Sequence, residues 1–415
     1  MKLEFGFGTR IEQVKVPDEN LLEILEPNTV EVERKGTEAV LYALENPIGA
    51  PKLRELLHPG QKLAIVTSDI TRPMPTAAVM PVLLDEIYRA GIDPQDITLV
   101  FALGSHRPHT EEEKRKLAGE RAYCEIKIED SNPQDCIHLG TTGRGTPVDI
   151  TRTVAEADIR ICLGNIEYHY FAGYSGGAKA IMPGVSTRRA IQSNHRLMIE
   201  EEAYAGHLEG NPLREDIEEA AALCGIDYIL NVVLDEHKKV IFAVAGDATK
   251  AHRAGTAFLD TLFLKKLKQR ADIVLVSQGG APKDMNLYQT QKALDNAKHA
   301  VKDGGTIILI GSCKEGMGES VFEEWMTQSE SPEAMIQRIG RDFQLGGHKA
   351  AAIAMVLQKA DIVLVSELPD SFVQSIFLKP ASSAQQAFDW AMQKYGPKAT
   401  VIAMPYGGST LPRPE

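Results

Sequence analysis

The chain has 415 residues, 43% hydrophobic and 25% charged, so it can bury a large core and is expected to form two domains. Its net charge of -12 argues against general binding to nucleic acid or a membrane surface. Five scattered cysteines, no signal-peptide pattern and no long apolar run indicate a cytoplasmic protein with reduced thiols.

In the first half of the chain, apolar runs of strand length alternate with helical patterns. The expected strands cover residues 3–16 (as a pair), 62–67, 97–103 and 158–163. The expected helices cover residues 37–45, 76–90 and 111–117. Thr110 and Glu113 form a capping box that begins the last of these helices.

The same alternation continues in the second half. Further helices are expected from residue 187 and over residues 211–222, 247–269, 287–302, 320–327, 332–339, 349–358 and 383–394. Further strands are expected over residues 227–234, 240–245, 272–277, 306–310, 361–366 and 399–403. The pattern predicts an α/β fold of two domains, residues 1–265 and 266–415, joined by the long helix 247–269. Both sheets should be largely parallel and covered by helices.

Residues 164–198 follow the expected strand 158–163 and are rich in glycine. Because ligands of open α/β sheets bind at the carboxyl ends of strands, we expect a functional site in this stretch. The loop containing Gly173, Ser175, Gly176 and Gly177 can turn N–H groups towards an anion such as a phosphate. The alternative is a glycine-rich turn that links two elements. The loop departs twice from the P-loop pattern, so an ordinary P-loop is a poor fit.

Lys179 and His195 stand in the same stretch. A lysine in such a loop can bind phosphate or, with its pKa lowered by burial, attack a carbonyl group; the alternative is a surface lysine. His195 lies on the helix expected from Thr187 and can ligate a metal; the alternative is a structural histidine. The chain has no HExxH or CxxC zinc pattern.

Two earlier strands also end in polar residues. Asp69 and Arg72 follow strand 62–67, and Arg72 can grip a carboxylate or phosphate; the alternative is a turn with Arg72 in solvent. His106 follows strand 97–103 and is placed as a general base, whereas His109 is closer to the helix start and is expected to be structural.

Gln289 and Lys292 lie three residues apart near the start of the expected helix 287–302. They therefore share a face of that helix. The pair is a candidate for closing over a crevice from the second domain. The alternative is a solvated helix face.

The motif order SDITRP, GSHRPHT, HYFAGYSGGAKAIMPG, SNH and NLYQTQK resembles the nickel-dependent lactate racemase family. Its members racemise or epimerise 2-hydroxy acids. The ten-residue step from His169 to Lys179 and the sixteen-residue step from Lys179 to His195 match as well as the residue types. The resemblance implies that residues 1–265 bind the cofactor and that the active site lies in the crevice between the domains.

The family uses a nickel-pincer nucleotide, a pyridinium-3,5-dithiocarboxylate-type mononucleotide that carries nickel. The resemblance implies that Lys179 can join covalently to one sulfur-bearing arm and that His195 ligates the nickel. It places Asp69 in the cofactor-binding motif. It also places the loop from Gly173 to Gly177 close to the nucleotide phosphate.

The resemblance also implies a set of groups for the substrate. His106 and His169 would face it from opposite sides as acid and base, during reversible hydride transfer from C2 to the cofactor. Arg72, Gln289 and Lys292 would hold its carboxylate. The chain lacks a GxGxxG motif after a strand, so a nicotinamide dehydrogenase is a poor fit.

One departure affects the substrate. Lactate-specific members carry an aromatic residue where this chain reads Gly346-Gly347-His348-Lys349. If His348 lines the pocket, a larger or more anionic hydroxy acid than lactate is favoured. The expected partners are this small substrate and the enzymes that synthesise the cofactor; the sequence does not specify an oligomeric state. Two competing interpretations remain, a P-loop-like hydrolase or phosphotransferase and a non-catalytic cofactor-binding protein.

Overall fold

The computed structural model describes residues 1–235 and 237–415, which form two compact units. The larger unit is Val30–Asp260, and the smaller unit combines Met1–Thr29 with Thr261–Glu415. The expected division at residue 265 differs from this in the first 29 residues. These belong to the smaller unit because strand β3 (Leu21–Ile24) pairs with β19 (Val401–Met404) at the edge of its sheet.

A six-stranded sheet forms the centre of the larger unit, in the order β13-β12-β9-β4-β5-β6. Its strands are β4 (Leu63–Ser68), β5 (Ile97–Ala102), β6 (Lys127–Asp130), β9 (Ile159–Asn165), β12 (Tyr228–Leu234) and β13 (Val240–Gly246). All neighbours are parallel except β12 and β13. The chain builds outwards from β4 through β5 to β6, then continues with β9 and β12 on the other side. β4 and β9 therefore flank the point where strand order reverses, which is where such sheets bind ligands.

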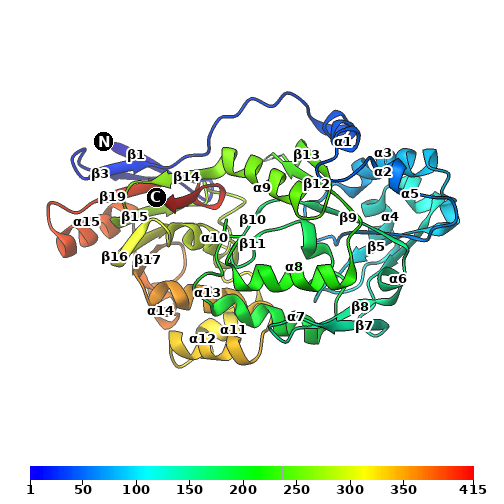
Figure 1. Ribbon diagram of the computed structural model, residues 1–415. Helices are drawn as coiled ribbons and strands as arrows, with labels where there is room; N and C mark the ends of the chain where they lie inside the picture. Colours follow the sequence, from blue (N-terminus) through cyan, green and yellow to red (C-terminus); the bar gives the residue numbers. More distant parts are fainter. Residues whose placement is uncertain (236) are drawn as a thin grey trace. The chain divides into compact units, whose positions relative to one another are not determined.

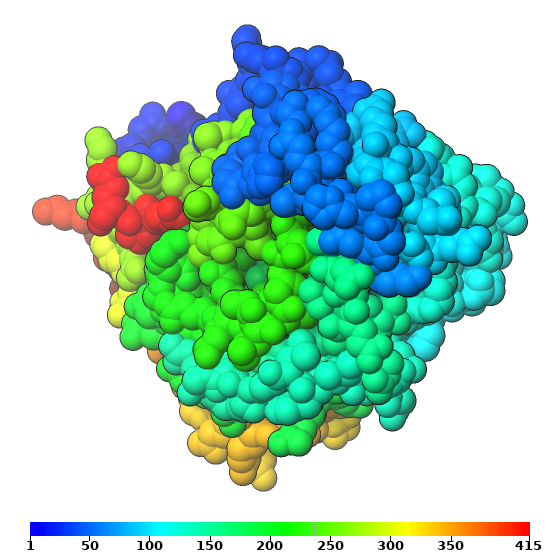
Figure 2. Space-filling model, turned by 45° about the vertical axis from the view of Figure 1, so that its right-hand side comes forward, coloured from blue at the N-terminus to red at the C-terminus, as the bar shows by residue number. Residues whose placement is uncertain are grey.

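Helices α1 (Gly36–Glu45), α2 (Leu53–Leu56) and α3 (Thr76–Arg89) contribute to a hydrophobic core on one face of this sheet. Figure 2 shows the blue segment with α1 and α2 against the green elements, in agreement with the packing of α1 on β12 and β13. The short helix η2 (Gly177–Ala180) packs on β4 and β9 and contacts α8 (Pro212–Cys224). The candidate loop is thereby held beside the strand-order reversal.

Shorter elements complete the larger unit. They are η1 (Pro94–Asp96), α4 (Glu111–Ala118), α5 (Glu120–Glu125), β7 (Cys136–Thr141), β8 (Pro147–Thr151), α6 (Arg152–Ala155), β10 (Tyr168–His169), β11 (Gly173–Tyr174), α7 (Arg188–His195) and η3 (Arg196–Ile199). The predicted capping box of Thr110 and Glu113 is confirmed at the start of α4. The predicted helix start at Thr187 is also confirmed, because its side chain accepts from the N–H of Ala190 as the N-cap of α7.

The smaller unit contains a second parallel sheet, in the order β18-β17-β16-β15-β19-β3. Its other strands are β15 (Ala271–Ser277), β16 (Val301–Ile310), β17 (Asp361–Val365) and β18 (Lys379–Ala381). The predicted hairpin at the amino terminus is confirmed as β1 (Lys2–Phe7) with β2 (Arg10–Lys15). In Figure 1 the blue amino-terminal strands lie beside the red carboxyl-terminal ones, as the pairing of β3 with β19 requires.

The helices of the smaller unit are α10 (Leu287–Ala297), α11 (Ser320–Gln328), α12 (Pro332–Arg341), α13 (Gly347–Leu357), α14 (Asp370–Ser375), α15 (Ala384–Tyr395) and η4 (Gly407–Ser409). The predicted long helix 247–269 is wrong in its extent. Helix α9 covers Lys250–Phe263, and β14 (Leu264–Leu267) follows it at once. β14 is a strand because it pairs with β20 (Leu411–Pro414), and that contact is distant in sequence.

The predicted α/β class with largely parallel sheets is confirmed in both units. All five cysteines are free thiols. Among the described residues, every helix is too short or too polar to cross a membrane.

Candidate functional site

Asp69 and His106 form a hydrogen-bonded pair at the carboxyl ends of the adjacent strands β4 and β5. Asp69 Oδ2 lies 2.7 Å from His106 Nδ1, and the Thr71 hydroxyl donates to Asp69 Oδ1 at 2.8 Å. Burial acts to raise the pKa of Asp69, but hydrogen bonds from His106 and Thr71 and the charge of Arg72 lower it overall. Because the carboxylate accepts from Nδ1–H, the lone pair of the neutral His106 ring is on Nε2.

His109 holds the loop that carries Asp69. Its Nδ1 lies 2.6 Å from Asp130 Oδ1, and its Nε2 accepts from the N–H of Ile70 at 3.1 Å. The ring is buried and packs edge-on against Phe101. These contacts fit the structural role expected for His109.

The Phe171 ring brings three of the candidate residues together. Its centroid is 4.4 Å from the His169 ring, 5.0 Å from the His195 ring and 5.9 Å from Lys179 Nζ. Phe171 is buried, and sequence reasoning missed it. The available signal was an aromatic residue two positions after a candidate histidine, in a loop that follows a buried strand. The His169–Lys179–His195 set is therefore one cluster of side chains.

The exit loop of β5 is tied to the segment that follows Lys179. The N–H of Gly104 donates to the carbonyl oxygen of Gly184 at 2.9 Å. A Cβ atom at Gly184 would come within 2.9 Å of Ala102 Cβ, so the two segments are closely packed. This contact attaches the loop of His106 to the loop of Lys179.

Lys179 lies on η2 in an environment that disfavours its positive charge. Burial lowers the pKa of its ammonium group well below the usual value, and the charges of Arg72 and Arg214 lower it further. In the described part of the chain, no carboxylate forms an ion pair with Nζ. This environment favours the neutral amine of Lys179 more than a surface position would, and its side chain is half-buried rather than fully exposed. Arg72 itself is exposed.

The glycines of the loop are explained by close packing. Gly173, Gly176 and Gly177 all have positive φ, between 57° and 76°. A Cβ atom at Gly173 would lie 2.1 Å from the carbonyl oxygen of His207, and one at Gly176 would lie 2.7 Å from Asn231 Oδ1. The linking-turn alternative therefore accounts for these glycines without a ligand.

The N–H groups of the loop are largely engaged within the chain. Those of Tyr174, Ser175 and Lys179 donate to backbone carbonyls, and that of Gly177 donates to Asn231 Oδ1 at 2.7 Å. The Ser175 hydroxyl donates to the carbonyl oxygen of Asn165 at 2.7 Å. These donors are committed to the fold and cannot also bind a phosphate in this conformation.

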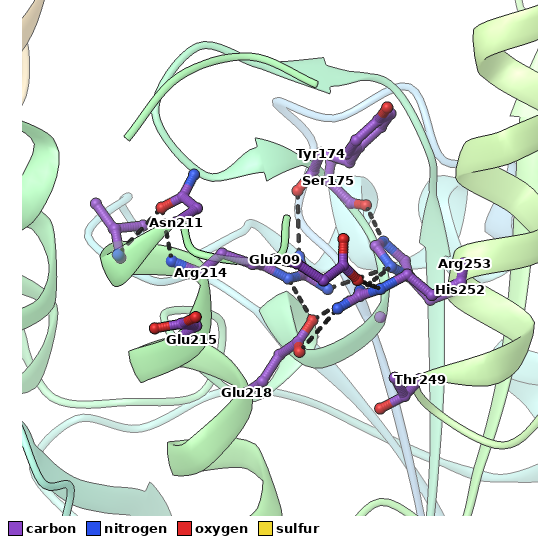
Figure 3. A network of polar contacts seen from close by, with 12 residues as sticks. Tyr174, Ser175, Glu209, Asn211, Arg214, Glu215, Glu218, Thr249, His252 and Arg253 are labelled. Carbon is purple, nitrogen blue, oxygen red and sulfur yellow. Dashed lines mark hydrogen bonds and ion pairs between the residues drawn. The ribbon is translucent and has the colours of Figure 1, made fainter. Parts of the chain in front are cut away.

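A buried ionic network lies behind the loop, as Figure 3 shows. Arg214 donates to Glu218 Oε1 at 2.7 Å and to the carbonyl oxygen of Tyr174 at 3.3 Å. Arg253 binds both oxygens of Glu218, at 2.9 and 3.1 Å. Burial acts to raise the pKa of Glu218, but the two guanidinium groups lower it to about 2. The network joins α8, α9 and the loop.

His252 completes this network. Its Nε2 lies 2.8 Å from the carbonyl oxygen of Ser175, and its Nδ1 faces Arg214 Nη2 at 3.3 Å. Because a carbonyl can only accept and a guanidinium can only donate, the proton is on Nε2 and the ring is neutral. Burial and the charge of Arg214 lower the pKa of His252 well below its usual value, in agreement with this assignment. Sequence spacing gave no signal for Arg214 or His252, which are far from the loop in the chain.

His195 is buried at the end of α7. Its Nδ1 lies 3.0 Å from Asn194 Oδ1. Within the described residues, no group of three or more His, Cys, Asp or Glu side chains is placed to hold a metal ion. The donors present thus fit a metal that takes one imidazole from the protein and its other ligands from an organic cofactor. A neutral Lys179 amine in the same cluster fits covalent attachment of that cofactor.

The remaining candidates lie in the smaller unit. Gln289 and Lys292 are exposed on α10, whose first turn is capped by Asn286. His348 is buried on α13, where its Nδ1 accepts from the N–H of Gly346 at 3.0 Å. Lys349 lies next to it and donates to the carbonyl oxygen of Tyr288.

The fold and the side-chain cluster define an α/β protein of two units. Its candidate functional residues lie where the strand order reverses in the sheet of the larger unit. The family models for the lactate racemase N-terminal and C-terminal domains match residues 7–206 and 266–411. A lactate racemase from Thermoanaerobacterium thermosaccharolyticum is 33% identical over 423 residues, which is 99% of each chain. One from Lactiplantibacillus plantarum is 30% identical over 420 residues, 98% of each chain.

Solved structures agree with these matches. The lactate racemase apoprotein from Thermoanaerobacterium thermosaccharolyticum superposes with a TM-score of 0.87 at 31% identity and covers 100% of both chains. A Thermotoga maritima protein shares the fold, with a TM-score of 0.61 at 19% identity over 91% of this chain and 97% of its own. The chain belongs to the lactate racemase family, as its motifs predicted.

Proposed function

We propose that this protein is a racemase or epimerase that inverts C2 of a 2-hydroxy acid with a nickel-pincer nucleotide as cofactor. The observation that carries the proposal is the single cluster formed by His169, Lys179 and His195 around Phe171. His106, which pairs with Asp69, lies in a loop that is hydrogen-bonded to the same segment. The relatives named lactate racemase support the reaction class.

Direct removal of the α-proton is an unfavourable route for such a substrate. The proton beside a carboxylate is weakly acidic, so the carbanion would be costly. When bound, the nickel-pincer nucleotide would supply an electron-poor centre that takes a hydride from C2 and returns it to either face. The protein would then only have to move the hydroxyl proton and hold a planar 2-oxo acid.

His106 is proposed as one of the two proton-transfer groups. Its Nε2 lone pair can accept the hydroxyl proton, and the Asp69 carboxylate stabilises the imidazolium that results. His169 is proposed as the second group, serving the opposite face. The roles of the two histidines exchange with the direction of the reaction, because an imidazole can act as either acid or base.

Other residues are proposed to bind the cofactor and the substrate carboxylate. Lys179 and His195 would hold the cofactor: the Lys179 amine would form a thioamide with a thiocarboxylate arm of the nucleotide, with loss of water, and His195 would ligate the nickel. The charge of Arg72 contributes to the lowered pKa of Lys179. Arg72 would bind the carboxylate of the substrate. Gln289 and Lys292 are proposed to bind the same carboxylate, from an exposed face of α10. If His348 lines the pocket, it would favour a larger or more anionic acid than lactate.

We further propose that the cofactor comes from separate synthesis enzymes in the cytoplasm, where free thiols stay reduced. The competing P-loop-like hydrolase is disfavoured because the loop departs twice from the P-loop pattern. A non-catalytic cofactor-binding role would leave the Asp69–His106 pair without a purpose.

The test is to produce the protein together with the cofactor-synthesis enzymes. We expect nickel near one equivalent per chain, a mass increase on the chain that Lys179→Met abolishes, and racemisation of at least one enantiopure 2-hydroxy acid. His106→Ala and His169→Ala should each lower kcat by about 10²–10⁴-fold while nickel is retained. His138→Ala is the matched control, because His138 also pairs with an aspartate, at 2.7 Å, but on the surface. Turnover of MgATP without nickel would support the hydrolase instead.

A further inference from the structure

We propose that Asn194 and Asp216 are positioning residues that fix the ring of His195 so that Nε2 is its metal-binding nitrogen. The identity of the metal rests on the proposed function, but the orientation of the ring does not. The contacts of the Asn194 amide leave one assignment of its oxygen and nitrogen.

The Asn194 side chain is buried between α7 and α8, where acceptors surround one end of its amide. Its Nδ2 lies 2.8 Å from Asp216 Oδ2 and 3.1 Å from the carbonyl oxygen of Leu213. Both partners can only accept, so the NH₂ group must face them. The opposite assignment would put the amide oxygen against two acceptors and leave the amide donors unsatisfied.

This orientation decides which ring nitrogen of His195 carries the proton. With the NH₂ group held by Asp216, the amide oxygen faces His195 Nδ1 at 3.0 Å. An amide oxygen can only accept, so Nδ1 of the neutral ring carries the hydrogen and Nε2 carries the lone pair. Histidine ligands of metals are commonly held in this way by a hydrogen bond at the other nitrogen.

Asp216 is itself held by two hydroxyl groups from the turn between β7 and β8. Thr142 donates to its Oδ1 at 2.5 Å, and Thr146 donates to its Oδ2 at 2.7 Å. The N–H of Thr146 donates to Thr142 Oγ1, so the Thr142 hydroxyl hydrogen is directed to the carboxylate. A buried carboxylate is costly unless it is hydrogen-bonded, and here these contacts satisfy it. The chain of contacts from the turn to His195 is therefore rigid.

The test measures the ring nitrogens of His195 by NMR in cofactor-free protein labelled with ¹⁵N-histidine. The pH should lie about two units above the ordinary histidine pKa, so that the ring is neutral. His195→Gln identifies the signals. In the wild type we expect a pyrrole-type Nδ1 and a pyridine-type Nε2. Asn194→Leu should convert this to a mixture of tautomers or to the opposite one, and Asp216→Asn should shift the populations in the same direction.

Ser193→Ala is the matched control, because Ser193 lies on the same helix as Asn194 and contacts the Thr146 hydroxyl rather than the Asn194 amide. It should leave the His195 signals unchanged. In protein produced with the cofactor-synthesis enzymes, Asn194→Leu should weaken nickel retention by about 10–100-fold relative to this control.

The proposal is overturned if wild-type His195 has its proton on Nε2, or if Asn194→Leu leaves the tautomer unchanged. Should Asn194→Leu fail to fold, the wild-type signals and Asp216→Asn still decide the question. If the protein never binds nickel but His195 shows the expected tautomer, the proposed function fails and this inference stands.

Discussion

At the scale of single residues, Lys179 has the most unusual environment. It carries a titratable amine in a buried cluster beside two arginines, so its pKa is lowered well below the usual value. The unfolded chain binds a proton at this amine up to pH of about 10.4, whereas the folded chain releases it at a lower pH. The free energy of unfolding should therefore rise with pH between the lowered folded-state pKa and about 10.4, by at most about 1.4 kcal/mol per unit.

Lys179→Met tests this directly in denaturant unfolding at several pH values. Methionine keeps much of the chain length without the amine, so the variant should be more stable than the wild type at neutral pH. The difference should shrink towards pH of about 10. Lys116→Met, on the exposed side of α4, is the control and should show no such trend. Equal pH dependence of wild type and Lys179→Met would contradict the assignment.

The sequence could predict the candidate residues that follow strand ends, because strand ends can be read from apolar runs. Asp69, His106 and His169 all belong to this group. It could not predict that Phe171 contacts His169, Lys179 and His195, because these contacts depend on how the loop folds. Nor could it predict that Arg214 and His252 bind the carbonyl oxygens of the loop, because that depends on how α8 and α9 pack behind it.

At the scale of elements, the network of Glu218 holds α8, α9 and the loop together. Its folded-state pKa of about 2 is below the ordinary glutamate value of about 4.3. The resulting stabilisation, roughly 3 kcal/mol, is present above the unfolded-state pKa and is lost as pH falls towards 2.

Glu218→Gln should therefore destabilise the protein at neutral pH and flatten the loss of stability between pH of about 5 and 2. Chemical unfolding followed across this range measures both effects. Glu215→Gln is the control on the same helix, since Glu215 forms an exposed ion pair with Arg144 at 3.1 Å and accepts from the N–H of Gly210 at 3.0 Å. A Glu218→Gln variant as stable as this control would show that the network contributes nothing.

The turn at Gly176 is the second test at this scale. Two features disfavour a side chain at Gly176. Its φ of +76° is strained for other residues, and an added Cβ atom would lie 2.7 Å from Asn231 Oδ1. Gly176→Ala should cost about 2–4 kcal/mol in unfolding free energy, more than Gly60→Ala, which has φ of +89° and open space around its Cβ. If both variants cost the same, backbone strain alone accounts for Gly176 and the close contact is unimportant.

The sequence predicts an element boundary where the signal is local, but not where the boundary depends on a contact distant in sequence. The capping signals at Thr110 and Thr187 were sufficient to locate two helix starts, because a cap is a local contact. The sequence of residues 264–267 is compatible with a helix as well as with a strand. Only its pairing with β20 makes it β14.

At the scale of the whole molecule, alternation of strands and helices predicted two parallel sheets. It did not reveal that β3, near the amino terminus, completes the sheet built by the carboxyl-terminal strands. Strand order in the larger unit is the feature on which the proposed function depends most. It puts the ends of β4, β5 and β9 side by side, and the candidate acid–base residues follow those ends.

The central claim is that this protein inverts a 2-hydroxy acid without exchanging its C2 hydrogen with solvent. The most direct measurement follows an enantiopure substrate in D₂O with the nickel-loaded protein, by chiral chromatography and NMR of the product. We predict loss of optical purity with protium retained at C2, because hydride leaves and returns within the site. Deuterium at C2 of the inverted product, or no inversion of any acid in a broad panel by fully nickel-loaded protein, would contradict the claim.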